Sequence, residues 1–159
     1  MITVRSALLI CSLAFPFPAQ AQSRPDFSGT WTMDRTRSES AMQADPIGPT
    51  TVVITALPAA LQIATTRDNK TATLVYKLDG SASPIPGGTA TSHWEGATLV
   101  IESIREIQGQ TVTTKESRRL NDGGNEMLVE TVLVVQHGYT LKGTQNYGAG
   151  KDVFTRVKE

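Results

Sequence analysis

The sequence contains few of the residues on which disulfides, metal sites and nucleic-acid interfaces depend. Of its 159 residues one is cysteine and two are histidine, and 15 basic residues balance 15 acidic ones to a formal net charge of +0. A zinc site needs three or four ligands, usually His or Cys, so we expect no metal and no cofactor. Balanced, scattered charge is not typical of a protein that binds nucleic acid. The absence of charge blocks and low-complexity tracts favours a single domain.

The one cysteine, Cys11, lies in a segment with the features of an export signal. Residues 1–21 combine a short apolar run with small residues at Ala19 and Ala21, which is the pattern of a cleaved signal peptide. The apolar run is too short to span a bilayer, which takes roughly 20 residues. We therefore expect an exported protein, periplasmic or secreted, with a single domain over 22–159, no membrane span and no disulfide.

The stretch 26–34 predicts the first strand of an all-β domain, because apolar and polar residues alternate along it. Glycine two positions before the tryptophan leaves room for the indole or for a crossing strand. The residues of the apolar face are Phe27, Gly29, Trp31 and Met33.

The same alternation recurs along the rest of the chain. A short helix is predicted over 36–44, an irregular loop over 79–88, and a glycine turn over 148–150. Further strands are predicted over 51–56, 61–66, 72–78, 89–94, 97–107, 110–120, 126–135, 139–147 and 152–158.

The hairpin formed by 97–107 and 110–120 has a register that the sequence predicts. If Gln108 and Gly109 form the turn, residue i pairs with residue 217 − i. That pairing places Glu102 opposite Lys115, a favourable cross-strand charge pair.

About ten strands joined by short turns form a meander, and a meander of this length removes its exposed edges by closing on itself. The predicted fold class is therefore all-β: a closed antiparallel up-and-down β-barrel of about 8–10 strands, with one short helix after the first strand. In such a barrel the first and last strands pair. A Greek-key sandwich is the alternative architecture.

With these residues in place, the chain resembles the calycin superfamily of lipocalins and fatty-acid-binding proteins, and within it the small bacterial secreted lipocalin-like domains. Residues 27–31 (Phe-Ser-Gly-Thr-Trp) match the Gly-x-Trp strand opening, and residues 154–157 (Phe-Thr-Arg-Val) match the arginine-bearing last strand. The resemblance implies that Arg156 lies across Trp31 near the closed barrel end, a cation–π contact contributing about 1 kcal/mol. Lys158 stands where fatty-acid-binding proteins usually carry the tyrosine of a carboxylate-holding Arg-x-Tyr pair.

Polar side chains on the predicted inward face form the candidate ligand site. A lone charge facing a core is costly, but Glu116 between Arg105 and Arg118 is balanced. Tyrosines add apolar wall with a hydrogen-bonding tip. An ion-pair network that fills the barrel, or a bulge that turns these side chains outward, are the alternatives. The candidate ligand-binding residues are Tyr76, Arg105, Glu116, Arg118, Tyr139, Gln145 and Tyr147.

The function that these patterns favour is an exported lipocalin-like protein that binds a small hydrophobic or amphipathic molecule inside the barrel. No Gly-x-Ser-x-Gly elbow or Cys–His pair is present, so no catalytic residue is assigned and an enzyme is less favoured. An isomerase or cyclase that uses Glu116 in the same cavity is one alternative. A filled barrel serving as a structural or interaction module of the cell envelope is the other.

Overall fold

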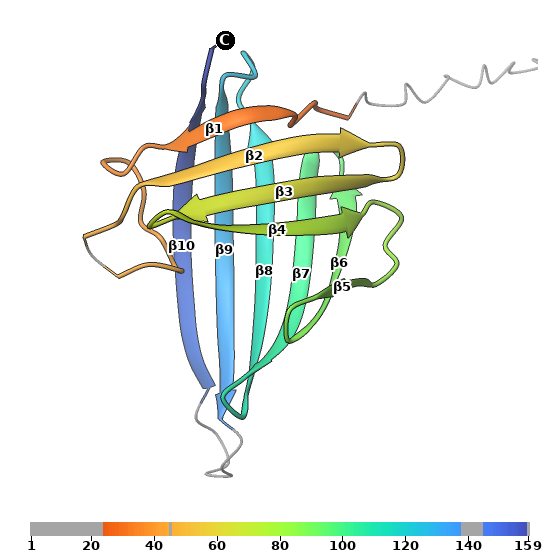
Figure 1. The fold of residues 1–159 in the computed structure, drawn as a ribbon, viewed down its shortest axis with the longest axis vertical. Coiled ribbons are helices and arrows are strands. Elements are labelled where there is room, and N and C mark those ends of the chain that lie inside the picture. Colours follow the sequence, from red (N-terminus) through yellow and green to blue (C-terminus); the bar gives the residue numbers. More distant parts are fainter. Residues whose placement is uncertain (1–23, 45, 138–144, 159) are drawn as a thin grey trace, which may run out of the picture.

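The computed structural model describes residues 24–44, 46–137 and 145–158, and in these ranges the regular structure consists of strands (Figure 1). Period-2 alternation of apolar side chains favours strands because it gives each strand one buried face. Within the described ranges no helix is long and apolar enough to span a membrane. The strands are β1 (Gly29–Met33), β2 (Thr50–Leu57), β3 (Ala60–Arg67), β4 (Lys70–Lys77), β5 (Ser83–Ile85), β6 (Gly88–Glu95), β7 (Thr98–Ile107), β8 (Gln110–Leu120), β9 (Glu126–His137) and β10 (Gln145–Arg156).

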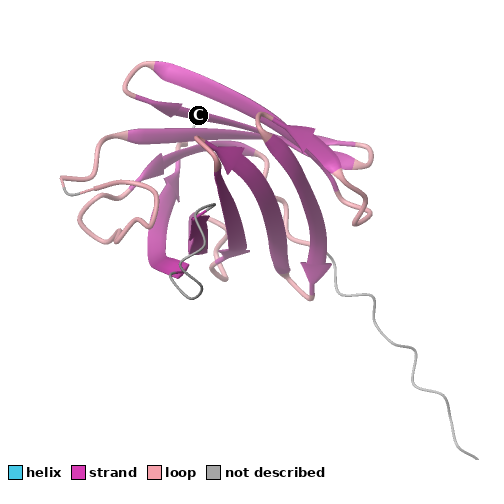
Figure 2. Cartoon of the chain, turned by 90° about the horizontal axis from the view of Figure 1, so that it is seen from below, coloured by secondary structure: helices cyan, strands magenta, loops and turns pink. Residues whose placement is uncertain are grey.

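The strands form one antiparallel sheet that curls into a nearly closed up-and-down barrel. Their order is β4-β3-β2-β1-β10-β9-β8-β7-β6-β5. Each strand therefore pairs with its sequence neighbours, except that β4 does not pair with β5 and that β1 pairs with β10. There Trp31 lies opposite Arg156, which confirms the predicted pairing of the first and last strands. Strands β1–β4 cross in front of β6–β10 in Figure 1, and Figure 2 shows them curving around a shared interior. The all-β barrel is therefore confirmed, and the Greek-key alternative is wrong.

Strand β4 and the β5–β6 hairpin approach each other without a backbone ladder. The Lys77 N–H donates to Ser83 Oγ at 2.9 Å, and Ser92 Oγ donates to the Lys77 carbonyl at 2.6 Å. The strand β5 itself lies within the stretch 79–88 that the sequence predicts as irregular. These side-chain links hold only one end of β4, so β4 remains an edge strand of the sheet.

A single apolar core fills the barrel beneath β1. Trp31 is fully buried and donates its Nε1–H to the Phe27 carbonyl at 2.9 Å. The Phe27 ring centroid lies 5.9 Å from that of Trp94. Burial of these rings removes a large apolar area from water, so the predicted first strand and its apolar face organise the core. The buried core also contains Met33, Ile54, Leu61, Ile63, Leu99, Ile101, Met127, Val129 and Phe154.

The β7–β8 hairpin has the predicted register. Gln108 and Gly109 have φ of 51° and 75°, as a two-residue turn matched to the strand twist requires. Glu102 lies opposite Lys115, and Lys115 Nζ is 3.6 Å from Glu102 Oε1. The pairing of residue i with 217 − i is confirmed.

Residues 36–44, predicted as a short helix, instead form turns beside β10; we call this segment the strap. Its Ser38 Oγ accepts a hydrogen bond from the Val153 N–H at 3.0 Å. The backbone of Glu39 exchanges two 2.7 Å hydrogen bonds with that of Lys151. Serine side chains compete with helical hydrogen bonds, and the strand provides backbone partners that a helix would have to forgo. The helix prediction is therefore wrong.

Strand β10 is continuous where the sequence predicts two strands around a turn at 148–150. A Cβ on Gly150 would lie 2.0 Å from the backbone nitrogen of Ala41 in the strap. Glycine at this position therefore permits the close approach of another segment and does not form a turn. Because the strand is unbroken, its alternation runs on through Gly148 and places Phe154 in the core.

Candidate ligand-binding site

Three of the predicted site residues meet on the inner face of the β7–β8 hairpin. Arg105, Glu116 and Arg118 share the face of the buried Leu99 and Ile101, because Leu99 lies opposite Arg118 and Ile101 opposite Glu116. Only 8% of Arg118 is exposed. The hairpin register thus brings two arginines and one glutamate into the barrel, as predicted.

Glu116 and Arg118 form a short, largely buried ion pair. Arg118 Nη2 donates to Glu116 Oε2 at 2.5 Å. The side chain of Arg118 is 10% exposed and that of Glu116 is 24% exposed. A buried charge is tolerated only when it is paired. Arg118 Nε and Nη1 have no hydrogen-bond partner among the described residues, so the pair uses only part of the donor capacity of this guanidinium.

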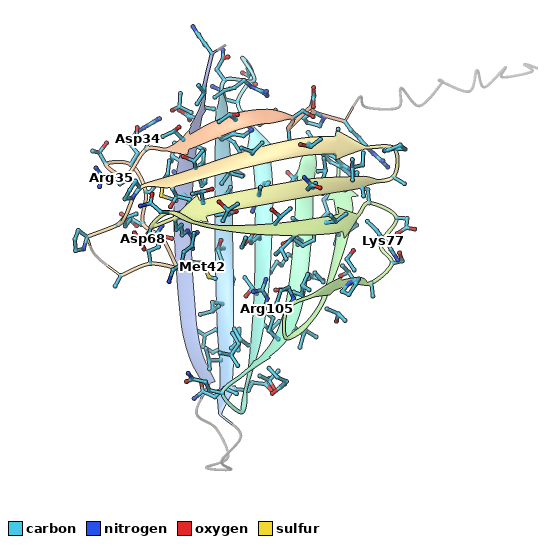
Figure 3. All side chains as sticks on the ribbon, in the orientation of Figure 1. Asp34, Arg35, Met42, Asp68, Lys77 and Arg105 are labelled. Atoms are coloured by element: carbon cyan, nitrogen blue, oxygen red, sulfur yellow. The ribbon has the colours of Figure 1, made fainter. Side chains whose placement is uncertain are left out.

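A cavity of about 70 Å³ lies beside the ion pair. Residues from β4, β7, β8 and the strap line it, and Figure 3 labels Met42 and Arg105 on the side of the barrel next to β4. The volume suffices for a few water molecules but is below the ~300–1,000 Å³ of typical ligand pockets. Side chains therefore fill most of this part of the interior. Tyr76, Arg105 and Glu116 contribute polar atoms to the wall, and Met42, Ile107 and Val112 contribute apolar ones.

Tyr76 supplies a protonated hydroxyl to this cavity. Its side chain is buried, and burial raises the pKa of the hydroxyl above its usual value of 10.0. The negative charge of Glu116 raises the pKa further, while Arg118 and Arg105 oppose the shift. At neutral pH the group therefore remains a hydrogen-bond donor.

Asp152 on β10 is an interior polar residue that sequence reasoning missed. Only 5% of it is exposed; its Oδ2 accepts from Ser40 Oγ at 3.2 Å, and Oδ1 has no partner among the described residues. Burial raises the pKa of this carboxyl, while the Ser40 hydrogen bond and the charge of Arg67 oppose the shift. Asp152 lies two residues before the buried Phe154 and therefore on the same face of β10. This spacing is the sequence signal for its inward position, and the turn predicted at 148–150 hides it.

Three predicted site residues do not join this cluster. Tyr147 lies on the outer face of β10 and is 71% exposed, so its predicted inward position is wrong. The physical reason is the continuous alternation of β10, which turns Tyr147 outward where Gly148 faces inward. Gln145 of β10 pairs with Gln136 of β9, but the side chain of Gln145 is outside the described part. Tyr139 also lies outside the described residues.

Arg156 covers Trp31 at the end of the barrel, as the calycin resemblance implied. Its guanidinium carbon lies 4.2 Å from the centroid of the Trp31 ring. The Nε donates to the Gly124 carbonyl at 2.9 Å, Nη2 donates to the Asp26 carbonyl at 3.0 Å, and Nη1 donates to the Ser28 carbonyl. One guanidinium thus joins the last strand, the β8–β9 turn and the segment before β1.

Metal-ligating side chains do not converge in the part of the chain that the structure describes, where no group of three His, Cys, Asp or Glu is placed to hold an ion. His93 Nε2 instead lies 3.1 Å from Glu95 Oε1. His137 is the last residue of β9, and its side chain is outside the described part.

No protein-family model and no curated protein sequence matches the chain, but solved structures do. Human cRBP IV is 16% identical with a TM-score of 0.56, and the match covers 83% of this chain and 98% of that one. A variant of the REP1-NXSQ fatty acid transporter is 14% identical with a TM-score of 0.53, covering 82% and 97%. Lipid binding protein 8 of Caenorhabditis elegans is 13% identical with a TM-score of 0.55, covering 82% and 95%. At these identities the likeness establishes the fold alone, a β-barrel shared with these three proteins.

Proposed function

We propose that the protein is exported and that its barrel binds a small, mostly apolar molecule whose acidic end meets Arg105. The cavity beside Tyr76, Arg105 and Glu116 is the observation that carries this proposal. Glu116 is neutralised by Arg118, whereas Arg105 has no ion-pair partner in the described part of the chain. The wall therefore carries a net positive charge, which favours an anionic end group. The names of two structural neighbours, a fatty acid transporter and a lipid binding protein, support a hydrophobic ligand.

A ligand of lipid length requires a larger cavity than the one observed. Met42 of the strap borders the cavity and is 45% exposed, and an unbranched thioether side chain adapts readily to new neighbours. We expect an apolar tail to displace Met42 and to pack against Ile107 and Val112. The Arg105 guanidinium then holds the polar end.

A matched pair of probes tests this proposal: a fluorescent long-chain fatty acid and a fluorescent alcohol of the same chain length. A hydrogen bond to a charged group contributes roughly 1.5–3 kcal/mol, so Arg105→Gln should weaken binding of the acid about 10- to 100-fold and leave the alcohol unchanged. Arg119→Gln is the control, because Arg119 is half exposed and paired with Glu130. Absence of binding by either probe, or equal losses for both, would contradict the proposal.

The small cavity volume favours a second candidate function, a side-chain-filled barrel that acts as an interaction module. About 70 Å³ is too little for a typical ligand. Native mass spectrometry of the protein purified from its own host separates the two candidates. Repeated recovery of the bare chain, together with no affinity for either lipid probe, would favour the interaction module over the binder.

A further inference from the structure

Part of the strap lies inside the barrel, against the inner face of β10. Gly150 shares that face with the buried Asp152 and Phe154, since alternate residues of a strand point the same way. A Cβ on Gly150 would lie 2.0 Å from the backbone nitrogen of Ala41 and 2.5 Å from the carbonyl oxygen of Glu39. The strap therefore crosses the inner face of β10 at Gly150, and its backbone fills space that a side chain of β10 would otherwise take.

The strap is anchored on both sides of its residues 40–42. Before them, the backbone of Glu39 exchanges two hydrogen bonds with the backbone of β10. After them, Gln43 Nε2 donates to Thr50 Oγ1 on β2 at 3.1 Å. Movement of residues 40–42 alone would therefore leave both anchors in place, so this short segment can be displaced without detaching the strap.

Residues 40–42 present a polar group and an apolar group to the interior, as an amphipathic ligand would. Ser40 Oγ donates to Asp152 Oδ2 at 3.2 Å, and within the described ranges this is the hydrogen bond that joins residues 40–42 to the barrel wall. Met42 borders the cavity that Glu116 also lines. A hydroxyl and a thioether two residues apart thus occupy the interior beside the candidate ligand site.

Asp152 has hydrogen-bonding capacity that the strap does not use. It is 5% exposed, and its Oδ1 has no partner in the described part of the chain. Arg118 lies in the same cross-strand row, on the far side of Val129, and its Nε and Nη1 are likewise buried and unpartnered there. The charges that act on Asp152 are those of Arg67, Arg118 and Glu116, so with Asp152 ionised two positive charges balance two negative ones. A group added here must be uncharged, donate to a carboxylate and accept from a guanidinium, and a hydroxyl meets all three conditions.

We propose that the ligand carries a hydroxyl along its chain and that this hydroxyl replaces Ser40 Oγ at Asp152 when residues 40–42 are displaced. The inference rests on the proposed function, in which an acidic end meets Arg105, and it narrows the ligand to a hydroxylated long-chain acid. Displacement of residues 40–42 joins the space around Asp152 to the present cavity and so provides volume that a lipid requires. Arg105 and Asp152 lie three strands apart, on β7 and β10, so the distance between the acid and the hydroxyl of the ligand is fixed.

Competition against the fluorescent long-chain fatty acid tests this ligand class. The competitors are octadecanoic acid and its monohydroxy isomers, which differ from one another only in the position of the hydroxyl. A hydrogen bond to a charged group strengthens binding about 10-fold, so the isomer whose hydroxyl reaches Asp152 should compete about 10-fold better than the unsubstituted acid. Isomers with the hydroxyl far from that position should compete less well than the unsubstituted acid, because they bury a hydroxyl without a partner.

Variants assign the preference to Asp152, measured as the ratio of the affinities for the preferred isomer and for the unsubstituted acid. Asp152→Asn keeps an acceptor but loses the charge, so the ratio should fall from about 10 to about 3, and Asp152→Leu should lower it to about 1. Ser40→Ala removes the competing hydroxyl and should raise the ratio above 10. Ser38→Ala is the matched control with an unchanged ratio, because Ser38 Oγ accepts from the Val153 N–H and does not contact Asp152.

Two outcomes would overturn the inference and leave the proposed function standing, provided that the unsubstituted acid binds and that Arg105→Gln weakens its binding. One is a ratio of about 1 or less for every isomer. The other is a ratio of about 10 that persists in Asp152→Leu, with far-UV circular dichroism showing that this variant folds. Acid binding that does not depend on Arg105 would instead refute the proposed function.

Discussion

Replacement of Arg156 by alanine is expected to lower the free energy of unfolding by about 3 kcal/mol. The guanidinium lies over the buried Trp31 ring at 4.2 Å, and a desolvated cation–π contact contributes about 1–2 kcal/mol. The same group donates to the carbonyls of Asp26, Ser28 and Gly124. Net hydrogen-bond contributions are about 0.5–1.5 kcal/mol each. Since the Asp26 contact is exposed and such terms are not additive, the three together add about 1.5 kcal/mol.

This loss is measured by urea unfolding, monitored by far-UV circular dichroism, as a lower urea concentration at the midpoint of the transition. For a domain of this size, 3 kcal/mol corresponds to a fall of roughly 10 °C in Tm. Arg156→Lys keeps the charge but replaces the planar fork by a single ammonium, so we expect about half the loss. Arg119→Ala is the control, because Arg119 is 53% exposed and lies 3.5 Å from Glu130. Its effect should stay within about 0.5 kcal/mol.

Two results would refute this reasoning about Arg156. Equal midpoints for Arg156→Ala and Arg119→Ala would show that the guanidinium does not hold the barrel end together. An Arg156→Lys protein as stable as the unmodified chain would show that positive charge alone accounts for the effect, and that the fork to three carbonyls does not contribute.

Three further predictions concern the strap and the carboxylates. Gly150→Ala should lower the free energy of unfolding, measured by urea titration, by more than about 2 kcal/mol, because its Cβ would lie 2.0 Å from the Ala41 nitrogen; Gly148→Ala, whose Cβ would meet only a side chain at 3.6 Å, is the milder control. Hydrogen bonds from the adjacent turn lower the pKa of Asp34 from 3.8 to about 2, so its contribution to stability is present above pH 3.8 and is lost as the pH falls towards 2. Asp34→Asn should remove this acid-side loss in urea titrations from pH 4 to 2. Burial raises the pKa of Asp152 above its usual value of 3.8. Ionisation of this carboxyl therefore lowers the stability of the folded protein as the pH rises above 3.8. Asp152→Asn should therefore be more stable than the unmodified chain at pH 7, with the difference vanishing near pH 3; a constant difference would contradict this assignment.

The local pairing of the strands could be predicted from the sequence because it depends on neighbouring residues. The β7–β8 hairpin follows from Gln108 and Gly109 and from the Glu102–Lys115 match, all within a short stretch. The inward positions of Arg105, Glu116 and Arg118 follow from that register alone. The contact of Arg156 with Trp31 came from resemblance to a family and not from any local pattern.

The errors arose where distant segments decide the local structure. The glycines in 148–150 predict a turn, but the strap passes so close to Gly150 that only glycine fits there. The same contact keeps β10 continuous, which turns Tyr147 outward and places Asp152 inside. The sequence of the strap lacks alternation and so predicts a helix, yet the backbone of β10 provides the strap with other hydrogen-bond partners.

The sequence by itself determined that this protein is all-β, which residues alternate, and how adjacent hairpins pair, because a two-residue period and turn chemistry are properties of the local chain. Tertiary structure alone decided the size of the cavity, the burial of Asp152 and the open edge of β4. These depend on how segments distant in sequence pack as the sheet curls. The cavity volume and the unpaired edge are properties of the nearly closed barrel as a whole and not of any single strand.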